Sequence, residues 1–334
     1  MGRKLAAVLG AWALLIGLAG CAGKPTALFT EESVTINAGT QWALGATLTI
    51  PNDAKAPLPA VVLVQGSGPS DRDETVYANK PFKDIAEYLS SHGIAVLRYD
   101  KRTSTYGAEM AADLANITVE TEMIQDTIAA ADLVKADARI DKSKVFLLGH
   151  SEGGMMTPRI DAEGGDFAGL VILAGSPRNL SDILIDQTAA AVEKLSDAQK
   201  PAGQLQLAQL IDLFDRLPTM TDDEARATTI GGASAYYFKE MNEHPASGYL
   251  TNLKKPVLIL QGDKDSQVNP VKDYGAYQTL LTGRDNVTFK LYPGLNHLFM
   301  TSITGTAADY QRPGHMDETV LKDITAWLQD QAIG

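Results

Sequence analysis

Short, mostly apolar runs recur along this chain, and they constrain its fold more than any other feature of the sequence. Each run is long enough for one strand buried on both faces, and such strands are typical of parallel sheets. The runs lie at Ala60–Val64, Ile94–Leu97, Val145–Leu148, Leu170–Leu173, Val257–Leu260 and Val287–Leu291. The sequence therefore predicts a largely parallel central sheet.

Segments with helical periodicity separate these runs. We predict helices over Pro81–Ser91 and Val119–Lys135, and a third around Ile324 near the C-terminus. Strands that alternate with helices predict an α/β fold, a doubly wound sheet with right-handed crossovers. Two strands are also expected before the first apolar run, at Ser33–Ala38 and Trp42–Ile50, and the second alternates as a half-solvated antiparallel strand does.

One stretch interrupts the alternation of strands and helices. Between Leu173 and Val257 the sequence has helical periodicity but no clear strand. We expect residues 180–249 to form a helical cap inserted above the sheet, and residues 31–179 and 250–334 to form the α/β core. The apolar faces of the cap helices either pack on the core or line a substrate pocket.

The sequence Gly149-His150-Ser151-Glu152-Gly153 directly follows the predicted strand Val145–Leu148. It matches the G-x-S-x-G pattern of a nucleophile elbow, in which a serine occupies a sharp turn between a strand and a helix. The glycines keep the neighbouring positions small, and the helix N-terminus beneath the serine favours a developing oxyanion. We therefore expect Ser151 to be a catalytic nucleophile.

A serine hydroxyl is a weak nucleophile and needs a base, and the chain has five histidines. His297 follows the last predicted strand and so lies at the carboxyl edge of the sheet, where α/β active sites are built. We expect His297 to be the base, with His315 as the second candidate, and we expect His150, adjacent to Ser151, to point away on the elbow. The base needs an acid to fix its tautomer, and both Asp263 and Asp265 follow the strand Val257–Leu260.

An oxyanion needs two backbone N–H donors. We expect one from the amide of Glu152, directly after the nucleophile, and the other from Ser67 in the loop after the first parallel strand. Charged residues beside buried strands are costly unless paired, so we expect Arg72 and Asp100 to form a network that holds this loop.

Taken together, these stretches resemble a bacterial family of exported α/β hydrolases related to serine aminopeptidases and alkyl esterases. The matching stretches are Gly66–Asp73, Leu97–Arg102, the elbow, Gly262–Val268 and Gly294–Phe299. The resemblance implies an α/β-hydrolase fold and carboxylesterase activity on short acyl esters. It also implies that Asp265, the fourth residue of the G-x-x-D turn, is the acid. Glu152 and Thr103 depart from the family's pattern, which commonly has an apolar residue and a glycine at these positions.

The expected reaction is ester hydrolysis through an acyl-enzyme on Ser151, with a small-molecule ester or acyl substrate and neither cofactor nor metal. A peptidase, a thioesterase and an acyltransferase use the same triad and remain alternatives. A non-catalytic binding lipoprotein is a further alternative, which the complete triad disfavours. The net charge of −12 without a Lys/Arg cluster argues against nucleic-acid binding.

The first residues are typical of an export signal. A short basic start precedes an apolar stretch that ends at Cys21, the only cysteine of the chain. This arrangement resembles a bacterial lipobox, so we expect residues 1–20 to be a signal peptide, Cys21 to be lipidated and residues 21–30 to form a tether. The lipid would hold the protein at a membrane. The expected location is the cell envelope, at the periplasmic face or on the outer membrane where there are two membranes.

Overall fold

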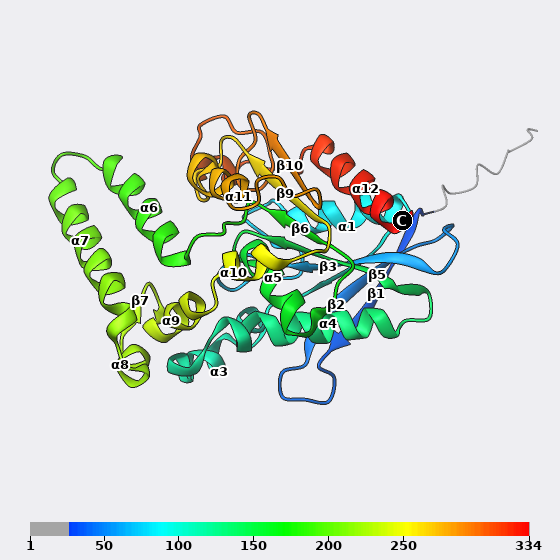
Figure 1. The fold of residues 1–334 in the computed structure, drawn as a ribbon, viewed down its shortest axis with the longest axis horizontal. Helices are drawn as coiled ribbons and strands as arrows, with labels where there is room; N and C mark the ends of the chain where they lie inside the picture. The colour runs from blue at the N-terminus through cyan, green and yellow to red at the C-terminus, as the bar shows by residue number, and fades with distance from the viewer. Residues whose placement is uncertain (1–26, 334) are drawn as a thin grey trace, which may run out of the picture.

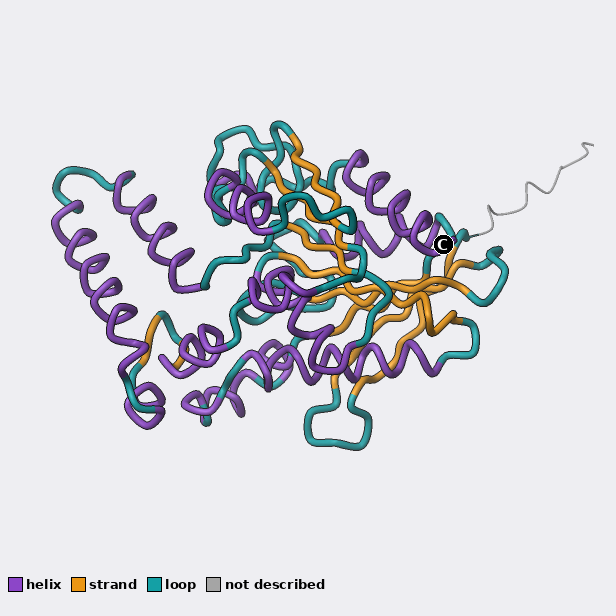
Figure 2. The backbone as a smooth tube through the Cα atoms, in the orientation of Figure 1, coloured by secondary structure: helices purple, strands orange, loops and turns teal. Residues whose placement is uncertain are grey.

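The structure is a computed structural model that describes residues 27–333, and an eight-stranded sheet lies at its centre (Figures 1 and 2). Its strands follow the order β1-β2-β4-β3-β5-β6-β9-β10. They are β1 (Phe29–Ile36), β2 (Leu44–Pro51), β3 (Leu58–Val64), β4 (Ala95–Tyr99), β5 (Ile140–His150), β6 (Leu170–Leu173), β9 (Val257–Gly262) and β10 (Val287–Tyr292). The β1–β2 and β2–β4 pairs are antiparallel and every other pair is parallel, which confirms the predicted architecture.

Helices cover both faces of the sheet, as expected for a doubly wound fold. On one face lie α1 (Pro81–Ser91) and α12 (Glu318–Ile333), and on the other lie α4 (Gln125–Ala136), α5 (Glu152–Ile160) and α11 (Gly275–Leu280). Strand β3 shows why its sequence is apolar throughout. Val61 and Leu63 point to the first face, whereas Val62 and Val64 point to the second. All four are fully buried, so each residue of the run contributes to one of two cores.

Residues between β6 and β9 form the helical insertion. It contains α6 (Leu180–Glu193), α7 (Lys200–Arg216), α8 (Asp222–Ala227), α9 (Ala235–Glu243) and α10 (Ala246–Asn252), with the two-residue strands β7 (Thr229–Ile230) and β8 (Ala233–Ser234). Figure 1 shows α6 and α7 as a hairpin that extends away from the sheet. The expected cap boundary between residues 249 and 250 falls inside α10.

Polar contacts fasten the base of the insertion to the core. Arg178 donates to Asp273 at 3.1 Å and to Asp186 of α6 at 2.9 Å. The amide of Gln187 in α6 donates to the carbonyl of Gln267 at 3.0 Å. The first turns of α6 are thereby tied to the loop after β9.

Short helices connect β4 to α4 at the carboxyl edge of the sheet. After β4 come α2 (Arg102–Thr105) and α3 (Gly107–Ala112), and one π-helical turn over Glu120–Ile124 precedes α4. The helix predicted over Val119–Lys135 is therefore present but begins in a wider turn.

In the described part of the chain, no helix is both long and apolar enough to cross a membrane.

Phe29 and Thr30, the last two residues of the expected tether 21–30, belong to β1. The expected signal peptide and Cys21 lie outside the described residues.

Candidate active site

Ser151 occupies the turn between β5 and α5, as the elbow motif predicts. Its backbone has φ 56° and ψ −120°, a strained conformation for a residue with a side chain. The turn is held by a hydrogen bond from the Ser151 amide to the carbonyl of Leu173 at 2.9 Å. A Cβ on Gly149 would lie 2.2 Å from the carbonyl oxygen of Gly153, so the close packing of strand against helix requires glycine there.

Asp265 and His297 are hydrogen-bonded to each other at the carboxyl edge of the sheet. His297 Nδ1 donates to Asp265 Oδ2 at 2.7 Å, and both side chains are almost fully buried. The alternative acid, Asp263, instead accepts from the amide of Gly294 at 2.7 Å. The alternative base, His315, is exposed on the surface and pairs with Asp84 at 2.9 Å. His297 therefore shares a cavity with Ser151 and has Asp265 as its partner, whereas Asp263 and His315 have other partners.

Ser151 and His297 line one cavity of about 150 Å³, together with His150, Gln267 and Tyr310. Within residues 27–333, no hydrogen bond joins the Ser151 hydroxyl to His297. Catalytic hydrogen bonds are often long in a ligand-free protein and shorten when substrate binds. The arrangement brings a serine hydroxyl and an imidazole to one cavity, and a carboxylate holds the imidazole from its other side.

The two expected oxyanion donors flank Ser151. Glu152 is the first residue of α5, where backbone N–H groups have no partner within the helix. Ser67 lines the cavity that contains Ser151 and His297, and it lines a smaller cavity together with both Ser151 and Glu152. The neighbouring Gly66 packs so closely that a Cβ there would lie 3.0 Å from Ser151 Cβ.

A charged network holds the loop that carries Ser67. Arg72 donates to both carboxylate oxygens of Asp100, at 3.0 and 2.5 Å, and to Thr47 at 2.9 Å. The ammonium of Lys101 donates to the carbonyl of Gly66 at 2.9 Å. The predicted Arg72–Asp100 network is thus confirmed.

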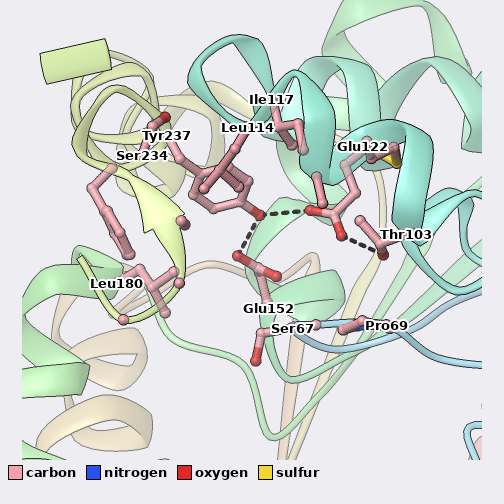
Figure 3. A pocket seen from close by; sticks show the side chains of 18 of the residues that line it. Ser67, Pro69, Thr103, Leu114, Ile117, Glu122, Glu152, Leu180, Ser234 and Tyr237 are labelled. Carbon is pink, nitrogen blue, oxygen red and sulfur yellow. Dashed lines mark hydrogen bonds between the residues drawn. The ribbon is translucent and has the colours of Figure 1, made fainter. Parts of the chain in front are cut away.

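A second, larger cavity of about 470 Å³ opens on the other side of Ser67 and Glu152 (Figure 3). Its walls come from the core and from the insertion, and they are mostly apolar. They include Met110, Leu114, Ile117, Leu180, Leu184 and Phe238. The insertion therefore does line a cavity, one of the two roles considered from its sequence.

A buried polar cluster borders this cavity. Figure 3 shows the Tyr237 hydroxyl between two carboxyl groups, and it lies 2.9 Å from Glu152 Oε1 and 3.2 Å from Glu122 Oε2. Lys101 Nζ lies 3.2 Å from Glu122 but 3.9 Å from Glu152, and Thr103 donates to Glu122 at 2.8 Å.

Burial raises the pKa of Glu152, and the Glu122 carboxylate adds to this effect while Lys101 opposes it. Burial also raises the pKa of Tyr237, with the carboxylates of Glu152 and Glu122 adding to the effect. The departure from the family's pattern at Glu152 thus places a carboxyl group in a buried cluster, where its proton is held more tightly than in water.

His150 is the residue at the site whose orientation sequence reasoning misjudged. We expected it to point away from the site, because it precedes the nucleophile on the elbow. Instead its ring lies 4.5 Å from that of His297, measured between ring centroids, and it is buried. Its partner Glu74 lies 76 residues earlier, so no local sequence signal indicated the contact.

Among residues 27–333, no group of three or more His, Cys, Asp or Glu side chains could hold a metal ion.

Comparisons with known proteins bear on this geometry. The model of the serine aminopeptidase S33 family matches residues 78–302. The esterase EstD of Thermotoga maritima is 36% identical over 301 residues, which cover 90% of this chain and 68% of that protein.

Two solved structures share the fold. Est1E of Butyrivibrio proteoclasticus covers 90% of this chain and 99% of its own, with a TM-score of 0.59 and 17% identity. A proline iminopeptidase of Mycobacterium smegmatis covers 90% of this chain and 99% of its own, with a TM-score of 0.57 and 16% identity. These matches confirm the α/β-hydrolase fold, and the family model and the EstD similarity together show that the chain belongs to the serine aminopeptidase S33 family of α/β hydrolases.

Proposed function

We propose that the protein is a serine carboxylesterase in which Ser151, His297 and Asp265 form the catalytic triad. The observation that carries the proposal is the buried Asp265–His297 hydrogen bond of 2.7 Å, formed beside a serine on a strained elbow. The similarity to the esterase EstD supports ester hydrolysis as the reaction.

The reaction has two steps. Ser151 Oγ attacks the acyl carbonyl, His297 Nε2 takes the hydroxyl proton, and the amides of Ser67 and Glu152 bind the oxyanion. The C–O bond to the alcohol then breaks as His297 returns the proton to the leaving alkoxide. In the second step water attacks the acyl-enzyme with the same base, which releases the acid and restores Ser151.

Each of the two cavities is suited to a different part of the substrate. The larger, mostly apolar cavity borders Ser67 and Glu152 and suits an acyl group. The smaller cavity contains Ser151 and His297 and is lined by more polar groups, which suits the alcohol and the incoming water. A volume of about 470 Å³ lies in the lower part of the range of small-molecule sites. We propose short acyl esters as substrates.

The location is a separate proposal. The apolar N-terminal stretch that ends at Cys21 supports export, cleavage after residue 20 and lipid attachment to Cys21. Labelling of cells with a radioactive fatty acid tests it. The parent chain is expected to take up label and C21S is not, and label in C21S would contradict the proposal.

Hydrolysis of p-nitrophenyl esters across a series of acyl lengths tests the enzymatic proposal, using protein that begins after Cys21. The parent is expected to turn over acetate and butyrate esters, and S151A is expected to lose several orders of magnitude in kcat/KM. A fluorophosphonate probe is expected to label the parent on Ser151 only. If the parent neither hydrolyses any ester nor reacts with the probe, the proposal is wrong. Parallel thioester and aminoacyl amide substrates separate the thioesterase and peptidase alternatives.

A further inference from the structure

His150 is a buried histidine for which the triad has no use. Its Nδ1 lies 3.0 Å from Glu74 Oε1, and its Nε2 lies 2.9 Å from the backbone oxygen of His297. Glu74 is itself buried, and its Oε1 also accepts the amide of Gly66 at 2.8 Å. One chain of hydrogen bonds therefore runs from the oxyanion loop, through the residue before the nucleophile, to the backbone of the catalytic histidine.

The partners of His150 define its protonation state. A backbone carbonyl can only accept, so Nε2 must carry a hydrogen. The Glu74 carboxylate is also an acceptor, so Nδ1 must carry a hydrogen as well. A histidine that donates from both nitrogens is an imidazolium. Burial opposes this charge, but the Glu74 carboxylate outweighs burial and raises the pKa of His150.

This chain of hydrogen bonds joins segments that are far apart in the sequence. Gly66 adjoins Ser67 and its proposed oxyanion amide, whereas the carbonyl bound by His150 belongs to His297 itself. We propose that Glu74 and His150 are positioning residues, an ion pair that fixes the oxyanion loop and the His297 loop at the spacing the reaction needs. This inference rests on the proposed esterase function for its kinetic consequences.

The charged groups around His150 make this device sensitive to pH. Glu74 faces it from the oxyanion loop, His297 from the loop after β10 and Asp265 from the loop after β9, and Tyr310 lines the same cavity. A neutral His150 can donate from one nitrogen only, so it loses the bond either to Glu74 or to the His297 carbonyl. We expect kcat to fall on the alkaline side when His150 loses its proton.

Three substitutions separate the parts of the pair. In H150N the side-chain amide can still reach Glu74 but not the carbonyl of His297, and in H150Q the reverse holds. E74Q keeps an oxygen for Gly66 and His150 but removes the charge, and Glu74 Oε2 has no hydrogen-bond partner in the described part of the chain. H315Q is the matched control, because His315 also pairs with an acidic side chain but is exposed.

The kinetic test measures kcat and KM for p-nitrophenyl butyrate from pH 6 to pH 10, per site titrated with fluorophosphonate. H150N is expected to lose on the order of 10- to 100-fold in kcat with little change in KM, since small misplacements of catalytic groups have effects of this size. E74Q is expected to keep the parent kcat at low pH but to show the alkaline fall at lower pH. H315Q is expected to match the parent. If H150N and E74Q lose only thermal stability and keep the parent's kcat and pH profile, the proposal is overturned.

Nitrogen-15 NMR of histidine-labelled protein gives a readout without catalysis, with H150Q identifying the signal. His150 is expected to show two protonated ring nitrogens at pH 7 in the parent and to titrate at lower pH in E74Q. A neutral tautomer at pH 7 in the parent would overturn the proposal. A parent that hydrolyses no ester but shows a charged His150 would instead refute the esterase function and leave the ion pair in place.

Discussion

Replacing Asp265 by asparagine gives a sharp prediction because all four of its hydrogen bonds are defined. Oδ1 accepts the backbone amides of Gln267 and Val268 at 2.8 and 2.9 Å. Oδ2 accepts His297 Nδ1 at 2.7 Å and the side-chain amide of Gln261 at 2.8 Å. In D265N the oxygen must stay on the side of the two backbone amides, because an NH₂ group there would face two donors that cannot turn away.

The NH₂ group of D265N therefore faces His297 Nδ1, which then has to accept rather than donate. The imidazole shifts its proton to Nε2, the nitrogen that must take the proton from Ser151. A base held in the wrong tautomer lowers kcat by about 10⁴-fold, or about 5 kcal/mol of transition-state free energy. KM is expected to change little, since Asp265 does not line the cavities described above.

The assay is p-nitrophenyl butyrate hydrolysis with stability followed by thermal unfolding, so that loss of fold is distinguished from loss of rate. D263N is the matched control. Asp263 lies two residues away and accepts only the amide of Gly294 among the described hydrogen bonds of its side chain, so its kcat is expected to stay within about two-fold of the parent. The reasoning is refuted if a folded D265N keeps kcat within ten-fold of the parent, or if D263N loses as much as D265N does.

Three further changes test the acyl cavity and the buried charges. L184W fills part of the larger cavity, so kcat/KM for the longest acyl chains is expected to fall at least about ten-fold relative to that for acetate in the same ester series. If the dependence of kcat/KM on acyl length is unchanged, the larger cavity does not bind the acyl group. D126A leaves Arg102 buried without its partner at 2.5 Å and is expected to lower the free energy of unfolding by about 3–5 kcal/mol in urea titrations; a loss under about 1 kcal/mol would be too small for this geometry. The third change, E152Q, tests the pH dependence of stability. The pKa of Glu152 is raised above 4.5, so the folded parent holds a proton that the unfolded chain releases. The stability of the parent therefore declines as pH rises from 4.5 through the raised pKa. E152Q lacks this decline, so its stability relative to the parent should increase over that range in denaturant titrations, and a constant difference would be inconsistent with the raised pKa.

The sheet could be predicted because its signal is local. A parallel strand inside the sheet needs apolar residues on both faces, so a run such as Val145–Leu148 marks its strand without knowledge of the neighbours. The residues at which the strands begin and end could be predicted less well. Strand β5 begins five residues earlier, at Ile140, because the backbone of this polar stretch pairs across a register shift with Leu58 of β3. Pairing of that kind depends on the neighbouring strand and leaves no apolar pattern.

The site shows the same division. Ser151 is marked by its own neighbours, and the loops that carry Asp265 and His297 follow predicted strands, so their meeting follows from the sheet. The buried cluster around Glu152 could not be predicted in this way. Tyr237 comes from the insertion, so only the packing of the insertion on the core brings it to Glu152. Lys101 comes from the loop after β4, and its contact with Glu152 depends on the packing of core loops that are distant in the sequence. The contact between His150 and Glu74 was missed because it joins two core segments 76 residues apart, with no local pattern to mark it.

The directions of the outermost strands have a practical consequence for the use of this protein. Strand β1 is antiparallel to β2, which is antiparallel to β4, so β1 starts at the amino edge of the parallel strands, opposite the turns that carry Ser151 and His297. Helix α12 ends at the same edge, where the carbonyl of Ala332 accepts the ammonium of Lys144 near the start of β5. A resin, an electrode or a fusion partner joined at either end of the described fold would therefore hold the molecule with both cavities turned outward. Immobilised protein is expected to keep its access to substrate whichever end carries the attachment.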